Sequence, residues 1–117
     1  MARIVVLDDD QIILDLLQTV LADSGHEPIV APALAAIPAN TRADVVITDL
    51  VPLKEYRRES AVQWLNDLRA HFAGSPVLII TAHSDAVAER DMLGADAIMP
   101  KPFDIDALLA KVDELLT

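Results

Sequence analysis

Short apolar runs alternate with helix-like segments along this chain, and this alternation constrains the fold more than any other feature. Four mostly aliphatic runs predict buried strands over residues 4–7, 45–48, 77–81 and 95–99, and a weaker run predicts a fifth over 27–31. None of the runs alternates cleanly between apolar and polar residues. This is typical of parallel strands that are covered on both faces.

Apolar residues at helical spacing fill the segments between these strands. The clearest stripe runs from Ile12 to Leu21 and is followed by Gly25, a common helix stop. Ser84 is expected to cap a helix that ends at Gly94. Further helices are expected around residues 61–68 and 108–116, and the Ala- and Pro-rich stretch 33–40 gives the weakest helical signal. A strand–helix unit repeated five times predicts a doubly wound α/β sandwich with a parallel sheet.

Composition and charge narrow the class of protein. The chain has 117 residues, which suits one domain over residues 1–117 with no output domain visible. Its net charge of −10 argues against direct binding of nucleic acid or of an anionic membrane. No cysteine is present to form a disulfide, and no apolar run is long enough for a membrane span. No signal peptide is expected, because acids begin at position 8, so a cytoplasmic location is expected.

Charged and polar side chains follow four of the predicted strands. The first strand runs into Asp8 and Asp9, the third into Asp49, the fourth ends at Thr81 and the fifth leads to Lys101. Because the carboxyl ends of parallel strands meet at one edge of the sheet, we expect these groups to converge there. Three carboxylates suit Mg²⁺, which prefers oxygen ligands, and the lysine and threonine suit a phosphoryl group. Taken alone, the acids at 8–10 could equally be helix caps.

Four motifs give the chain its family resemblance. They are "VVLDDD", "DVVITDLVP", "PVLIITAHSD" and "GADAIMPKPF", in family-like order and spacing. With them the chain resembles a response-regulator receiver domain over essentially its full length. The resemblance implies a five-stranded parallel sheet in the order 2-1-3-4-5 with helices on both faces.

The resemblance also implies the metal site. Asp49 would be the phosphate acceptor, and Asp8 and Asp9 the acidic pair. Asp9 and Asp49 would bind Mg²⁺ directly, Asp8 would act largely through water, and the backbone carbonyl of Val51 would be a further ligand.

The remaining site residues follow from the same resemblance. Thr81 would bond the phosphoryl group and Lys101 would pair with its oxygens, and the bond from Lys101 to Pro102 is cis in similar proteins. The partner would be a sensor histidine kinase or a histidine phosphotransfer protein. The domain would be a signalling module and not an enzyme, catalysing only its own phosphorylation and dephosphorylation. Homodimerisation through the last helix–strand–helix face is common in similar domains and stays open here.

Three positions depart from the family pattern. Ile98 stands where similar domains often carry an aromatic residue, and Pro100 replaces a non-proline residue before Lys101. Residues 53–60 are an apparent insertion that holds Lys54, Arg57 and Arg58. This segment is expected to be a solvated loop or an early turn of the next helix, with a basic flap beside the pocket as the competing hypothesis.

Two other functions are compatible with the sequence. A pseudo-receiver would bind its partner without being phosphorylated. A haloacid-dehalogenase-like phosphatase would use Asp8 and Asp10 as nucleophile and acid, but that interpretation gives Asp49 no role. It also needs a further acidic pair after its lysine, and Asp104 and Asp106 follow Lys101 too closely to serve.

Overall fold

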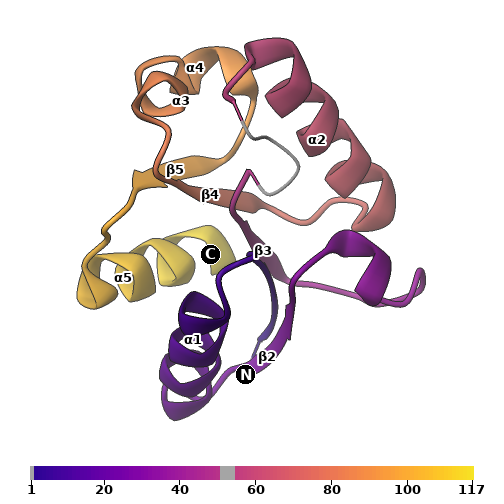
Figure 1. Ribbon diagram of the computed structural model, residues 1–117. Helices are drawn as coiled ribbons and strands as arrows, with labels where there is room; N and C mark the ends of the chain where they lie inside the picture. Colours follow the sequence, from indigo (N-terminus) through magenta and orange to yellow (C-terminus); the bar gives the residue numbers. More distant parts are fainter. Residues whose placement is uncertain (1, 51–54) are drawn as a thin grey trace.

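The computed structural model describes residues 2–50 and 55–117. Its centre is one parallel sheet in the order β2-β1-β3-β4-β5, which confirms the predicted fold class (Figure 1). The strands are β1 (Arg3–Leu7), β2 (Glu27–Ala31), β3 (Val45–Thr48), β4 (Val77–Thr81) and β5 (Ala97–Pro100). Three of them, β2, β3 and β4, have the predicted bounds.

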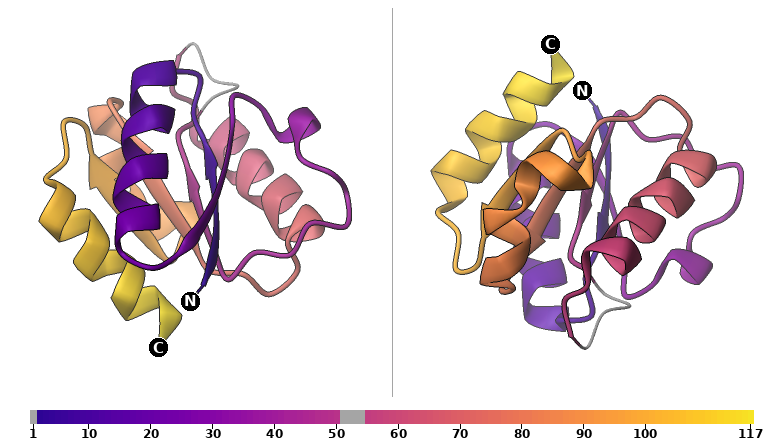
Figure 2. Two further views of the ribbon diagram at one scale, coloured as in Figure 1. Left: turned by 90° about the horizontal axis from the view of Figure 1, so that it is seen from below. Right: turned by 90° about the horizontal axis from the view of Figure 1, so that it is seen from above.

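Helices cover both faces of the sheet (Figure 2). The helices α1 (Gln11–Asp23) and α5 (Ile105–Leu116) pack on one face. The helices α2 (Arg58–His71), α3 (Ser84–Ala88) and α4 (Arg90–Leu93) lie over the other. Within the described residues, no helix is both long enough and apolar enough to span a membrane.

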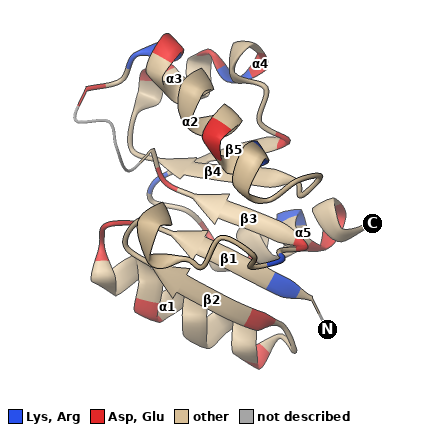
Figure 3. Cartoon of the chain, turned by 90° about the vertical axis from the view of Figure 1, so that its right-hand side faces the viewer, with Lys and Arg blue, Asp and Glu red and all other residues tan. Residues whose placement is uncertain are grey.

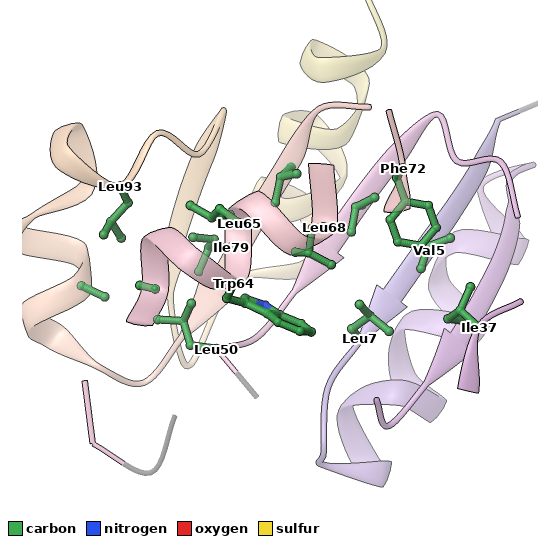
Figure 4. Close-up of a cluster of buried hydrophobic side chains, with 14 of the residues drawn as sticks. Val5, Leu7, Ile37, Leu50, Trp64, Leu65, Leu68, Phe72, Ile79 and Leu93 are labelled. Carbon is green, nitrogen blue, oxygen red and sulfur yellow. The ribbon is translucent and has the colours of Figure 1, made fainter. Parts of the chain in front are cut away.

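Two cores therefore sandwich the sheet, and strand side chains enter both. In β1, Ile4 and Val6 face α1 and α5, whereas Val5 and Leu7 face α2. Because both faces of the strand are buried, its sequence shows no alternation between apolar and polar residues. Figure 4 shows the core under α2, where Trp64 lies among aliphatic side chains from the sheet. Aliphatic side chains dominate both cores.

The second crossover corrects one predicted helix. The stretch 33–40 forms only a three-residue 3-10 helix, Leu34–Ala36. Pro32 and Pro38 bracket it, and the segment between these two prolines is too short to form a stable α-helix. Ile37 nevertheless fills the core beside β2.

The segment after β4 also differs from the prediction. Two short helices replace one, and the break lies at Glu89, whose φ of −101° and ψ of 16° leave helical geometry. Ser84 is the first helical residue and not the cap, because the cap position belongs to His83. Gly94 ends α4 as predicted, with a φ of 80° in the left-handed region that favours glycine.

The last strand is displaced toward the C-terminus from its predicted position. The backbone N–H and the carboxylate of Asp96 both bond to Val77, and β5 begins only after Asp96. Pro100 closes this edge strand opposite Thr81, where the next residue, Lys101, donates its backbone N–H to the Thr81 carbonyl at 2.8 Å. An edge strand tolerates a proline because one side of its backbone has no partner strand.

Candidate functional site

Asp8 lies directly beyond β1 at the carboxyl edge of the sheet. Its backbone N–H still donates to Ala31 of β2, so the strand direction carries its side chain into the molecule, where it is 0% exposed. Its Oδ1 accepts a hydrogen bond from the backbone N–H of Asp10 at 2.9 Å. A charged side chain this deeply buried requires compensating partners.

The three consecutive acids have three different environments. Asp10 is the cap of α1, with its Oδ1 accepting from the Ile12 N–H at 2.9 Å. Asp9 is exposed and Asp8 is buried. The helix-cap interpretation therefore holds for Asp10 alone, and the other two carboxylates remain available for the predicted site.

Asp49 follows β3 and lies beside the end of β1. Its backbone N–H donates to the Leu7 carbonyl at 2.8 Å, which ties it to the strand that precedes Asp8. Its Oδ1 accepts from the Leu50 N–H at 2.7 Å, and its side chain is 17% exposed. This carboxylate is held by the backbone and still reachable from solvent.

Lys101 joins the two least exposed acids of the cluster. Its Nζ lies 2.9 Å from Oδ2 of Asp8 and 3.1 Å from Oδ2 of Asp49. The peptide bond from Lys101 to Pro102 is cis, as the resemblance implied. The predicted convergence of Asp8, Asp9, Asp49 and Lys101 is thus present in the structure.

Burial and charge act against each other in this cluster. Burial raises the pKa of Asp8, and the nearby Asp49 charge adds to this, while the hydrogen bonds from Lys101 and from the Asp10 N–H oppose it. Burial acts to lower the pKa of Lys101, but its hydrogen bonds to Asp8 and Asp49 outweigh burial and the pKa is raised. Lys101 is therefore a cation at neutral pH. Burial makes the charged form of Asp8 unfavourable in the folded protein.

The acidic cluster fits a small divalent cation. One carboxylate oxygen from each of Asp8, Asp9 and Asp49 lies within 4.8 Å of the other two. Carboxylates are hard oxygen donors, which Mg²⁺ prefers over nitrogen or sulfur. Lys101 neutralises only part of the negative charge, so a further cation would relieve the remaining repulsion. The Val51 carbonyl, predicted as another ligand, lies outside the described residues.

Thr81 lies at the end of β4 and is 0% exposed. Its Oγ1 accepts from the backbone N–H of His83 at 3.0 Å. Among the described residues it makes no hydrogen bond to the acidic cluster. The side chain is therefore at the predicted edge of the sheet but is engaged with the loop that leads into α3.

The described part of the apparent insertion, residues 55–60, is divided between a loop and the start of α2. Arg58 already belongs to α2, and its guanidinium lies 3.8 Å from the Glu89 carboxylate, so it is directed toward the α3–α4 segment. Arg57 precedes the helix and is exposed, and Lys54 lies outside the described residues. For Arg58 the early-turn interpretation is correct.

Sequence reasoning missed two sets of contacts beside the site. The Tyr56 hydroxyl donates to Oε1 of Glu89 at 2.7 Å, and its ring centroid lies 6.3 Å from that of His83. Trp64 donates its indole N–H to Thr48, the residue before Asp49. The Tyr56 contacts depend on how the segment before α2 lies against the α3–α4 segment, and the Trp64 contact depends on how α2 sits over the sheet. No local pattern in the sequence indicates either.

Comparison with known proteins agrees with this geometry. The family model described as "Response regulator receiver domain" matches residues 4–113. The chain is 35% identical to the response regulator MprA of Mycobacterium sp. (strain KMS) over 121 aligned positions, which cover 97% of this chain and 50% of that protein. It is 34% identical to MprA of Mycolicibacterium vanbaalenii with the same coverage. The chain thus spans about half the length of the curated relatives it matches.

Solved structures share the fold across nearly the whole chain. A Francisella response regulator receiver domain matches with a TM-score of 0.75 at 27% identity, covering 99% of this chain and 97% of that chain. A CheY-like receiver domain protein from Methanospirillum hungatei matches with a TM-score of 0.75 at 28% identity, covering 99% and 94%. A response regulator from Thermotoga maritima, at 21% identity and a TM-score of 0.80, covers 99% and 98% and supports the fold alone.

Proposed function

The chain belongs to the response regulator receiver domain family, and we propose that it is a phosphorylatable member in which Asp49 accepts a phosphoryl group. The observation that carries the proposal is the pair of contacts from Lys101 to Asp8 and Asp49 beside a third acid, Asp9. An acidic cluster alone has many uses. A cluster in which a lysine contacts the two least exposed acids combines carboxylates that can hold a cation with a positive charge that can pair with phosphoryl oxygens. Phosphoryl transfer requires both.

The donor in this proposal is a phosphohistidine on a sensor histidine kinase or phosphotransfer protein. An Asp49 carboxylate oxygen forms a bond to phosphorus as the bond from phosphorus to the donor imidazole breaks. The imidazole leaves with the electron pair and takes up a proton, and Asp49 becomes an acyl phosphate. Lys101 would pair with the phosphoryl oxygens, and the 3.1 Å between its Nζ and the Asp49 carboxylate supports this role.

Asp8, Asp9 and Asp49 would hold Mg²⁺, with the Val51 carbonyl as a further candidate ligand. When bound, the ion would neutralise charge on the transferring group. Asp8 contributes by its fixed position, because its buried side chain is held by the Asp10 N–H and by Lys101. Thr81 is proposed to donate its O–H to the phosphoryl group, a donor role that is separate from its present acceptance of the His83 N–H.

This chemistry serves signalling and not turnover of a substrate. The only reactions proposed are the domain's own phosphorylation and its hydrolysis by water. The net charge of −10 supports a protein partner over nucleic acid, and Figure 3 shows the positions of the acidic and basic residues along the ribbon. A cytoplasmic location accords with a kinase partner.

The test is the intact mass after incubation with Mg²⁺ and acetyl phosphate. We expect the wild type to gain one phosphoryl group and Asp49→Asn to gain none. Omission of Mg²⁺ should also prevent labelling. A wild type that stays unlabelled while an ordinary receiver is labelled beside it would favour the pseudo-receiver. Labelling that depends on Asp8 as nucleophile, with hydrolysis of a phosphate monoester, would favour the phosphatase.

A further inference from the structure

We propose that Thr48 and Trp64 are positioning residues that fix the orientation of the Asp49 carboxylate. This inference rests on the proposed function of Asp49. The Thr48 hydroxyl donates to the backbone carbonyl of Asp49 at 2.5 Å, and its Oγ1 accepts from the indole Nε1–H of Trp64 at 3.1 Å. A side chain of α2 is thereby linked through two hydrogen bonds to the backbone of the acceptor residue.

Both residues are withdrawn from water. Thr48 is 0% exposed and Trp64 is 9% exposed, so water does not replace either partner readily. Every buried side-chain polar atom among the described residues has a hydrogen-bond partner. The indole N–H therefore depends on Thr48, and a buried donor left without an acceptor is unfavourable. This dependence makes the arrangement specific for one rotamer of Thr48.

The peptide unit between Asp49 and Leu50 transmits this constraint to the carboxylate. A trans peptide is planar, and its C=O and N–H point in opposite directions. The C=O of this unit accepts from Thr48, and its N–H donates to Oδ1 of Asp49 at 2.7 Å. Holding the carbonyl toward Thr48 therefore holds the Leu50 N–H toward the carboxylate.

The opposite sides of Asp49 are also restrained. Its own N–H donates to Leu7, and its Oδ2 is the oxygen that faces Lys101. The side chain of Leu50, 2% exposed, lies in the same core as Trp64, as the labels in Figure 4 show. With Oδ1 held by the peptide and Oδ2 directed to Lys101, the carboxylate has one favoured orientation.

Loss of the hydrogen bonds made by Thr48 should slow phosphoryl transfer to Asp49 more than it destabilises the fold. Phosphoryl transfer depends on the alignment of the attacking oxygen, and a small misplacement slows such reactions strongly. Loss of the Thr48 hydroxyl frees the Asp49 carbonyl and the Trp64 N–H together. The peptide unit then loses the hydrogen bond that holds its carbonyl toward Thr48, and its N–H is held toward Oδ1 less strictly.

The experiment measures the rate of labelling by acetyl phosphate with Mg²⁺, in variants shown by circular dichroism to be folded at the assay temperature. Thr48→Val, which keeps the shape and removes the hydroxyl, should slow labelling about tenfold. Thr48→Ser restores a hydroxyl and should return the rate to within about twofold of wild type. Ile79→Val, at the position paired with Thr48 in β4, is the matched packing control and should leave the rate unchanged.

Each outcome bears on the proposal. A wild type that is not labelled would overturn the proposed function and this inference with it. A labelled wild type with Thr48→Val equally fast would overturn this inference alone, as would failure of Thr48→Ser to recover the rate. If Thr48→Val does not fold, Trp64→Phe decides, because it keeps an aromatic ring and removes the N–H donor. We expect it to slow labelling about threefold, and an unchanged rate would reject the role.

Discussion

Lys101 and Asp8 are 93 positions apart in sequence, yet their Nζ and Oδ2 atoms lie 2.9 Å apart. Asp8 is fully buried and Lys101 is 18% exposed, so the pair is shielded from most of the solvent. Removing one partner of a shielded pair leaves a charge that the fold cannot solvate well. The free energy of unfolding should therefore depend on the cations that face Asp8, which are Lys101 and any bound Mg²⁺.

The first prediction concerns Lys101→Met. In metal-free buffer at neutral pH we expect it to lower the free energy of unfolding by about 2 kcal/mol, after allowing for partial solvent exposure. Urea unfolding checks this, and added Mg²⁺ should reduce the loss because a second cation then faces Asp8. Lys111→Met, which removes an exposed pair with Glu114, is the control and should cost under about 0.5 kcal/mol. Equal losses for the two variants would contradict the prediction.

The second prediction concerns Asp8→Asn. Burial raises the pKa of Asp8 above its ordinary 3.8, so the folded chain keeps its proton at a pH where the unfolded chain has lost it. Stability therefore falls as pH rises from 3.8 through the folded pKa, and the full penalty is present above it. At neutral pH without Mg²⁺, the neutral amide should raise the free energy of unfolding by about 1 kcal/mol.

Thermal unfolding with and without Mg²⁺ provides the measurement for Asp8→Asn. The variant should lose most of the stabilisation that Mg²⁺ gives the wild type. Asp10→Asn is the matched control, because asparagine also caps a helix and Asp10 lies outside the cluster. It should keep the Mg²⁺ response. A variant at position 8 that is less stable than wild type without Mg²⁺ would show that pairing with Lys101 outweighs burial.

The sheet and the position of the acids were predictable for the same physical reason. Strands buried on both faces must be continuous aliphatic runs, so the limits of β3 and β4 show directly in the sequence. Because parallel strands end at one edge, Asp8, Asp49 and Lys101 had to converge. The contact between Asp8 and Lys101 follows from the topology of the sheet, and no local sequence pattern indicates it.

The errors arose where tertiary contacts outweighed local patterns. The helical pattern from Ser84 to Gly94 is continuous, but its middle residue, Glu89, is bonded to Tyr56 and paired with Arg58 from another element. The roles of Thr48 and Trp64 were hidden similarly, since a threonine at a strand end and a tryptophan in a helix usually indicate packing. Their hydrogen bond depends on the position of α2 over β3.

The third prediction uses Tyr56, the single tyrosine of the chain. Burial and the hydrogen bond to Glu89 raise its pKa from 10.0 to about 12. The stabilising effect of that hydrogen bond is therefore fully present below pH 10.0 and is lost as pH rises through about 12. Absorbance of the ionised phenol should show one transition near pH 12 while the protein stays folded.

Glu89→Ala should move that transition toward the ordinary tyrosine value, because it removes both the acceptor and the negative charge beside the phenol. Glu114→Ala removes a distant carboxylate on α5 and should leave the midpoint unchanged. A wild-type midpoint near 10.0 would mean that the bond between Tyr56 and Glu89 does not persist in solution.

The fourth prediction uses Trp64, the single tryptophan. Its indole N–H is bonded to Thr48, whose hydroxyl is bonded to the Asp49 carbonyl, so a change at Asp49 alters the surroundings of the fluorophore. Addition of acetyl phosphate in the presence of Mg²⁺ should therefore change the emission of the wild type at the rate at which the phosphoryl group is gained. Asp49→Asn should show no change in emission with acetyl phosphate. Thr48→Val should become labelled with a much smaller change in emission, because the link between the acceptor and the indole is then broken. A full emission change in Thr48→Val would show that phosphorylation reaches Trp64 by another route through the core.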